Sequence, residues 1–367
     1  MNDKLLIDRA ALDKMARRRA ALEAQIEWWQ REAKAGDPVM QGYLGNAYYL
    51  GEGVERDLRQ ALKWWRKSAE QGDAISQYNL GIALAWDAGV ERDMSEAAAW
   101  WRKAAERGHP RAQYQLGVAY RNGAGVALDY GAGLKWWRKA AAQGDDLAQC
   151  DLGLACVYTD PRQAAAWWRK AAAQGNADAQ YNLGLLYNDG DGVAKNPNRA
   201  VKLWRKAAAQ EHADAQYALG DAYHCGEGVE CDAAEAVAWW RKAAAQGHAE
   251  AQCDLGTAYA EGHGVAQDQQ TALEWWRQAA DGGTPEERSI EARRRLGMAY
   301  QNGNGVERDL YQAAIWYGAA AWYGDRSSQQ RLNWMKRHHP ELRAQFEKAK
   351  AEVMSLVHGD LRRARGE

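Results

Sequence analysis

Apolar residues recur along this chain at helical spacing, in pairs of segments that repeat about every 36 residues. In residues 73–108, apolar positions three and four apart run to about Trp86 and resume after Asp93. This spacing predicts two amphipathic helices per repeat. In most copies Gly-x-Gly-Val joins the two segments and a Gly follows the second, which predicts a tight corner and a helix end. The unit of the fold is therefore expected to be a helical hairpin.

Two short motifs mark each repeat. Trp-Trp pairs begin at Trp28, Trp64, Trp100, Trp136, Trp167, Trp239 and Trp275, and a single Trp stands at Trp204 and Trp316. Leu-Gly pairs begin at Leu44, Leu80, Leu116, Leu152, Leu183, Leu219, Leu255 and Leu296. Motifs that recur at a period of roughly 20–50 residues indicate a solenoid, in which each unit buries its apolar face against its neighbours. The Trp column is therefore interpreted as core between helices rather than as a ligand cage.

The start of each second helix is also predicted. An Asp or Asn stands three residues after the turn Val, at Asp57, Asp93, Asp129, Asn196, Asp232, Asp268 and Asp309, and such residues cap helices. Glu96, three residues after Asp93, suggests a capping box. After Leu152 the repeat is shortened, and Asp160 with Pro161 is expected to begin the second helix without a glycine turn. Extra residues around 282–288 lengthen another corner.

Composition narrows the class of protein. The chain has 367 residues and a formal net charge of -1, so no global field attracts nucleic acid or an anionic membrane. It has no run of about 18 apolar residues that would span a membrane, and its first residues lack the pattern of a secretory signal. The five cysteines occupy substituted repeat positions rather than a disulfide framework. We therefore expect a cytoplasmic protein.

The repeat resembles a known family. Residues 180–193 read Gln-Tyr-Asn-Leu-Gly-x-x-Tyr-x-x-Gly-x-Gly-Val, and Trp204 begins Trp-Arg-Lys-Ala-Ala. This motif resembles the Sel-one-like repeat, a relative of the tetratricopeptide repeat, over about residues 37–324 as eight units. The resemblance implies an all-α, right-handed α/α superhelical solenoid whose first helices line a concave face. Residues 1–36 are then N-terminal capping helices, and residues 325–367 are a C-terminal helical cap and basic tail.

The resemblance also implies a function. It predicts a non-catalytic scaffold or adaptor for a protein or peptide partner, of a bacterial regulatory, secretion-associated or immunity type, with no cofactor. One alternative is a hydrolase of the β-lactamase-like kind attributed to some members. The Ser-x-x-Lys, Ser-Asp-Asn and Lys-Thr-Gly motifs of such enzymes are absent here. An enzyme is therefore not expected.

Two further sets of residues suggest other binding chemistries. Arg-Lys follows most Trp positions, at Arg66–Lys67, Arg102–Lys103, Arg138–Lys139, Arg169–Lys170, Arg205–Lys206 and Arg241–Lys242. This basic column suggests a nucleic-acid binder, but it also fits a solvated outer face near helix C-termini, and no nucleic acid is expected. His224, Cys225, Cys231, Cys253 and His263 lie in neighbouring repeats, but their spacing matches no standard zinc pattern, so no metal is expected.

The concave face is the better candidate for binding. By analogy with tetratricopeptide repeats, its exposed positions are Tyr43, Tyr78, Ile82, Trp86, Tyr114, Val118, Leu154, Tyr158, Tyr181, Leu185 and Tyr217, with the acids Asp178 and Asp214. Aromatic residues dominate interaction hot spots. A bound segment is expected to place apolar residues on the aromatic half and basic residues on the acidic half. The tyrosines could instead serve only to pack successive first helices together.

Overall fold

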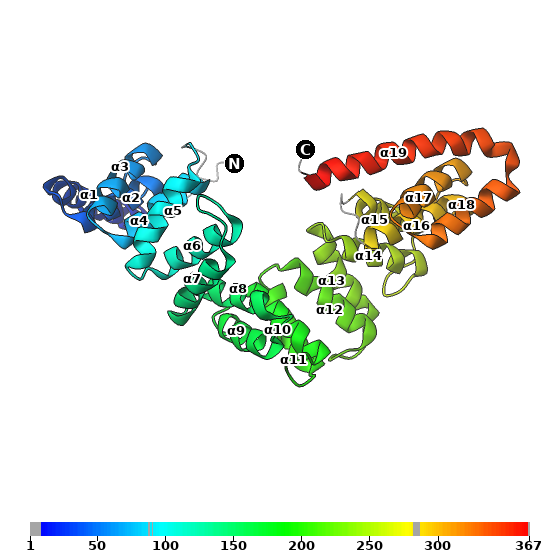
Figure 1. Ribbon diagram of the computed structural model, residues 1–367, viewed down its shortest axis with the longest axis horizontal. Coiled ribbons are helices and arrows are strands. Elements are labelled where there is room, and N and C mark those ends of the chain that lie inside the picture. Colours follow the sequence, from blue (N-terminus) through cyan, green and yellow to red (C-terminus); the bar gives the residue numbers. More distant parts are fainter. Residues whose placement is uncertain (1–8, 87–88, 90, 282–286, 366–367) are drawn as a thin grey trace. The chain divides into compact units, whose positions relative to one another are not determined.

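The computed structural model describes the backbone of residues 9–86, 89, 91–281 and 287–365, and the side chains of residues 21–86, 89, 91–281 and 289–357. Within these ranges the only regular elements are helices, as the sequence predicts. They follow one another as antiparallel pairs (Figure 1). The chain divides into two compact units, residues 1–174 and 175–367.

Unit 1 contains nine helices in its described part: α1 (Arg9–Ala35), α2 (Pro38–Leu50), α3 (Leu58–Glu70), α4 (Ala74–Trp86), α5 (Met94–Glu106), α6 (Pro110–Asn122), α7 (Tyr130–Ala142), α8 (Asp146–Cys156) and α9 (Pro161–Ala173). From α2 onward, even-numbered helices are the first helices of the hairpins and odd-numbered ones the second helices. Helix α1 runs without a break through the segment that carries Trp28 and Trp29.

The described part of unit 2 contains α10 (Ala177–Asp189), α11 (Pro197–Ala208), α12 (Ala213–Cys225), α13 (Ala233–Ala245), α14 (Ala249–Glu261), α15 (Gln269–Asp281), α16 (Glu287–Asn302), α17 (Leu310–Trp322), α18 (Arg326–His338), the short 3-10 helix η1 (Pro340–Leu342) and α19 (Arg343–Arg365). The lengthened corner predicted around residues 282–288 lies largely outside the described residues. Among the described helices, none combines the length and apolar character needed to cross a lipid bilayer.

The helix ends form as predicted, with one exception. Asp160 caps α9 by accepting the Gln163 N–H, and Pro161 occupies the first turn. Asp93 caps α5 in the same way. The capping box expected at Glu96 is wrong, because the Asp93 N–H donates to the Leu84 carbonyl at 3.0 Å. That bond closes the corner of the hairpin and leaves Glu96 free to accept from Arg66 instead.

The core of each hairpin is a Leu–Gly step that faces the second Trp of the pair. Leu116 is fully buried, and Trp137 is 2% exposed. A Cβ built on Gly117 would overlap the Trp137 indole and also crowd the Gly133 carbonyl at 3.1 Å. The indole therefore occupies the space that a side chain at Gly117 would need. The same glycine–aromatic contact recurs in the hairpins from α2–α3 to α16–α17.

Buried glutamines connect successive hairpins within each unit. Gln113 Nε2 donates to the Ala105 carbonyl at 3.0 Å, and Gln113 Oε1 accepts from Gln143 Nε2 at 2.9 Å. The amide thus satisfies the end of the preceding second helix and bonds to its own second helix. The Gln41, Gln180 and Gln216 amide oxygens accept from Gln71, Gln210 and Gln246 in the same arrangement. These bonds fix the register of successive hairpins inside the core.

We expect Gly117→Ala to destabilise the folded chain by about 1–3 kcal/mol, because the new methyl group overpacks the Trp137 contact. Gly131→Ala is the matched control. Gly131 is exposed in the first turn of α7, and a Cβ there would meet only the Asp129 side chain, at 3.3 Å. Urea denaturation followed by tryptophan fluorescence measures both. Equal stabilities of the two variants would contradict the assigned role of the Gly117 contact.

Candidate functional site

The predicted site residues lie on the first helices, except Tyr158, which lies in the turn between α8 and α9, and four of those in unit 1 are well exposed. Tyr43, Trp86 and Leu154 are 46%, 55% and 45% exposed, and Tyr158 is almost fully exposed. Trp86 still leans against the core, with its ring centroid 5.3 Å from that of Trp101. These side chains supply accessible aromatic and aliphatic surface. We call the exposed positions of the first helices in each unit its first-helix face.

The other tyrosines of the predicted column are half-buried against the next repeat. Tyr78 stacks on His109 with ring centroids 4.9 Å apart, and the Tyr114 hydroxyl donates to Asp151 Oδ2 at 3.0 Å. Burial raises the pKa of both tyrosines. In unit 2, Tyr181 and Tyr217 pack against His212 and His248, with ring centroids 5.0 and 4.6 Å apart, and burial raises the pKa of Tyr181 to about 12. These rings serve packing on one side and leave only their other side accessible. Ile82, Val118 and Leu185 are likewise half-buried.

Sequence inspection missed the role of three histidines. His109, His212 and His248 cap first helices, each accepting a backbone N–H on Nδ1 at 3.2 Å. Each Nε2 must then carry the proton in the neutral ring. His212 Nε2 lies 3.1 Å from Asp178 Oδ1, and His248 Nε2 lies 3.2 Å from Asp214 Oδ1. Their position in the repeat could have indicated this capping role, because each stands where Asp73 or Asp145 precedes the equivalent helix.

The acids of the predicted site are therefore partly structural. The bond from His248 lowers the pKa of Asp214, which stays ionised. Asp178 and Asp214 are nevertheless exposed on the first-helix face of unit 2. Each stands in the first turn of its helix, where a negative charge also offsets the helix dipole. They contribute negative charge to this face while fixing the histidine caps.

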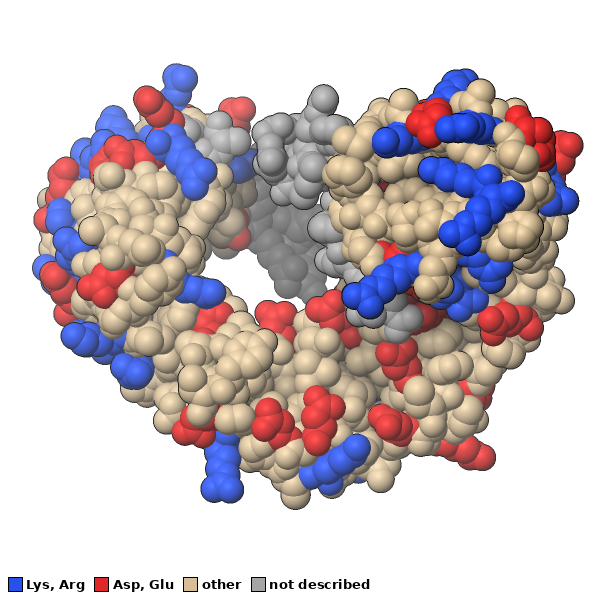
Figure 2. Space-filling view, turned by 45° about the vertical axis from the view of Figure 1, so that its right-hand side comes forward, with Lys and Arg blue, Asp and Glu red and all other residues tan. Residues whose placement is uncertain are grey.

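The basic column is engaged within the fold. In five second helices the Lys that follows the Trp pair lies over the first Trp ring of that pair, as Lys103 Nζ does over Trp100 at 3.8 Å. Lys67, Lys139, Lys170 and Lys242 make the same cation–π contact. Arg102, Arg205 and Arg241 donate to the hydroxyls of Tyr120, Tyr223 and Tyr259 on the next first helix. Figure 2 shows basic and acidic side chains intermingled on the face in view rather than one continuous basic stripe.

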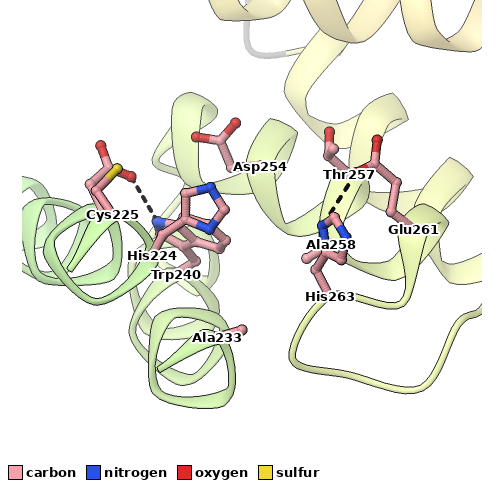
Figure 3. Close-up of a pocket in the computed structure, with 10 residues that line it drawn as sticks. His224, Cys225, Ala233, Trp240, Asp254, Thr257, Ala258, Glu261 and His263 are labelled. Atoms are coloured by element: carbon pink, nitrogen blue, oxygen red, sulfur yellow. Dashed lines mark hydrogen bonds and ion pairs between the residues drawn. The ribbon is translucent and has the colours of Figure 1, made fainter. Parts of the chain in front are cut away.

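Three cavities open between successive first helices, and we call them inter-repeat slots. The acidic slot lies between α12, α13 and α14 and has a volume of about 370 Å³. Figure 3 shows His224 beside Trp240 at one end, with Glu261 and His263 facing each other at the other. Asp221 and Asp254, which also line this slot, accept hydrogen bonds from Trp240 Nε1 and the Tyr217 hydroxyl. The slot therefore combines three carboxylates with an aromatic wall.

The mixed slot occupies the equivalent place in unit 1, between α6, α7 and α8. It has a volume of about 290 Å³ and contains Arg121, Tyr130, Asp151 and Leu154. Arg121 stands at the repeat position of His224, and Leu154 at that of Thr257. The Arg121 guanidinium lies 5.5 Å from the Trp137 ring centroid. The same architecture thus presents a cation and apolar side chains here, where the acidic slot presents carboxylates.

The basic slot lies between α16, α17 and α18, with a volume of about 500 Å³. Its wall contains Arg294, Arg331, Tyr317 and Trp334. Glu291 holds Arg294, with Nη2–Oε1 at 2.6 Å, whereas Arg331 is exposed and is available to an anionic group. Within unit 2 the first-helix face therefore changes from acidic to basic along the stack.

The residues weighed as a zinc site do not form one. Cys253 is fully buried in a hydrophobic cluster, whereas Cys225, Cys231, His224 and His263 are exposed at the helix ends and turns. In the part of the chain that the structure describes, no three His, Cys, Asp or Glu side chains converge on a point where a metal ion could bind.

Comparison with known proteins gives one consistent result. The Sel1 repeat family model matches residues 38–73, 74–109, 110–145, 147–176, 177–212, 213–248, 249–284 and 290–321. A protective antigen of uropathogenic Escherichia coli with an SLR fold is 34% identical, at a TM-score of 0.82, over 94% of this chain and 75% of that one. A Sel1 repeat protein from Oxalobacter formigenes is 33% identical, at a TM-score of 0.62, over 85% of this chain and 90% of that one. No curated protein matches the sequence.

The histidine caps generate a pH prediction. Burial lowers the pKa of His109 below its ordinary value, so the unfolded chain binds a proton at that residue at a higher pH than the folded chain. The stability that the neutral cap provides is complete above about pH 6.5 and declines as the pH falls through the folded pKa. We expect the melting temperature to fall more between about pH 7.5 and pH 5.5 in the parent than in His109→Asn. Asn preserves the cap, as Asn176 does for α10; equal losses would contradict the prediction.

Proposed function

The chain belongs to the Sel1 repeat family, and we propose that it is a non-catalytic scaffold that binds a segment of a partner protein on its first-helix face. Sel1 repeat proteins generally act in protein–protein interactions. The relatives above come from bacteria, and we propose a bacterial regulatory, secretion-associated or immunity setting. A cytoplasmic location fits the five cysteines, none of which forms a disulfide.

The observation that carries the proposal is the recurrence of one slot with different linings. The hairpin core leaves a cavity between successive first helices at three places, and each cavity is large enough to take a side chain of a bound segment. Their linings differ in charge: carboxylates in the acidic slot, a cation with apolar groups in the mixed slot, and arginines in the basic slot. Complementary charges set specificity and the rate of association.

The slots of unit 2 predict the chemistry of the bound segment. A Lys or Arg fits the acidic slot, where Asp221, Asp254 and Glu261 supply carboxylates. An Asp or Glu fits the basic slot beside Arg331. The acidic and basic slots are two repeats apart, which is about 20 Å if packed helices are about 10 Å apart. In an extended segment this distance corresponds to roughly six residues between the basic and the acidic side chain.

Unit 1 predicts an apolar partner surface. Its exposed Tyr43, Trp86, Leu154 and Tyr158 provide aromatic and aliphatic contacts, and buried aromatic anchors dominate binding energy in protein interfaces. The half-buried tyrosines contribute the accessible sides of their rings. Substituting Tyr78 or Tyr114 would therefore disturb packing as well as binding, so variants at these positions cannot isolate the binding role.

We expect peptides selected from a random displayed library against the whole chain to contain a basic residue about six positions from an acidic one. Glu261→Lys should weaken the binding of a selected peptide roughly tenfold, because it reverses charge in the acidic slot. Fluorescence anisotropy of the labelled peptide measures the effect.

Glu274→Lys is the matched control, since Glu274 is exposed on the second helix α15 and lines no slot. It changes the net charge by the same amount. The proposal is wrong if both variants weaken binding equally. It is also wrong if binding is lost only when Arg102 or Arg138 on the second helices is replaced by Glu.

A further inference from the structure

Helix α18 stands at the position of a first helix in the repeat. The face that earlier first helices bury against a second helix is accessible on α18. Asp325 caps it, and Gln329 and Leu332 follow that cap by four and seven residues. Gln113 and Leu116 follow their cap at the same two positions and are 5% and 0% exposed. In contrast, Gln329 is exposed and Leu332 is only half-buried. The polar and apolar positions that earlier hairpins enclose are therefore accessible at this end.

The exposure follows from where α19 packs. In every described hairpin the second helix covers the first, but α19 packs against α17 instead of α18. Gly318 permits this, because a Cβ there would lie 2.7 Å from Val353 Cγ2. Earlier second helices have Arg at this position, such as Arg102 and Arg205. The last hairpin is thus left with a cleft where part of its second helix would lie.

The cleft is apolar inside and positive at its rim. It has a volume of about 390 Å³, and its apolar lining includes Trp322, Leu332, Phe346 and Met354. Trp322 is 55% exposed. Lys336 on α18 and Lys350 on α19 also line the cleft and are exposed. No ion pair is formed by either lysine with another described residue.

We propose that this cleft binds an amphipathic helix of a partner protein, with aliphatic side chains in the cleft and carboxylates paired with Lys336 and Lys350. The argument for a helix is the fold itself, since a helix covers the equivalent face in each earlier hairpin. Gln329, Leu332 and Lys336 span two turns of α18, or about 10 Å. That length matches side chains four and seven residues apart on a docked helix.

The occupant is not a second helix from another copy of this chain. Asn333 stands where the earlier first helices have the glycine of Leu-Gly, so the indole of a repeat Trp would have no room there. The second helices of this chain also carry Arg-Lys after Trp, which places cations rather than carboxylates beside the lysines. The cleft therefore selects a different helix, with Leu-sized residues and an acidic border.

This site is independent of the proposed first-helix binding. Arg331 and Trp334 of α18 line the basic slot, whereas Gln329, Leu332 and Lys336 line the cleft. The two sites thus use different faces of one helix. A variant in the cleft can be tested without changing the acidic slot.

The test uses two synthetic helical peptides of about 15 residues with leucines along one face, bordered by Glu in one and by Lys in the other. Fluorescence anisotropy with the full chain should show the Glu peptide binding at least roughly tenfold more tightly than the Lys peptide. In the double variant Lys336→Glu with Lys350→Glu, this preference should reverse. The double control Arg337→Glu with Lys348→Glu alters neighbouring exposed residues of the same helices and should retain the parent preference.

Hydrogen exchange locates the bound peptide. Protection within residues 326–336 and 343–354 supports the proposal, and protection confined to α14 overturns it. Failure of the Glu peptide to bind also overturns it, as does an equal loss in the control variant. If the Glu peptide displaces a dimer of the chain in light scattering, the cleft is a self-association site and the proposal is wrong. Glu261→Lys should leave this binding unchanged, which separates its failure from failure of first-helix binding.

Discussion

The structure depends on the contact between the glycine of each Leu-Gly step and an indole of the second helix. Because Gly117 has no side chain, the two helices approach until Trp137 lies on the backbone of α6. In the hairpin α16–α17, Tyr317 occupies the place of the Trp against Gly297. Its hydroxyl donates to Gln301 Oε1 at 2.8 Å. The constraint is therefore steric, and it tolerates a change of aromatic ring as long as the opposite residue stays small.

This core contact also connects packing with surface chemistry. The indole N–H lies against the first helix, and a buried N–H needs an acceptor there. Trp137 donates to the Tyr114 carbonyl, whereas Trp240 donates to the carboxylate of Asp221 in the acidic slot. Replacing a backbone acceptor by a side chain thus places a charged group on the face without disturbing the core. Variation of this kind lets one scaffold present slots of different charge.

At α18 the contact between a glycine and an aromatic ring is lost, and the regular stacking of hairpins changes there. At α18, Asn333 replaces glycine and α19 turns to pack on α17, so the stacking that could continue indefinitely stops. The apolar residues left over form a cleft rimmed by lysines. Terminal repeats must stop further stacking to remain soluble. Here the same departure from the repeat both ends the solenoid and creates a surface that the internal hairpins lack.

The sequence by itself determined the hairpins, their caps and the buried Leu and Trp columns, because helical periodicity and residue size act locally and recur in register. The helix start at Asp160 and Pro161 could be predicted for the same reason. For the histidine caps, the sequence showed only that these residues stand at cap positions. A His accepts an N–H there only when its proton is on Nε2, and the sequence does not specify the tautomer. Only the tertiary structure decided that Tyr78 and Tyr217 are half-buried, that the Lys and Arg column is engaged, and where cavities remain. Those outcomes depend on contacts between successive repeats, whose distances no spacing within one repeat specifies.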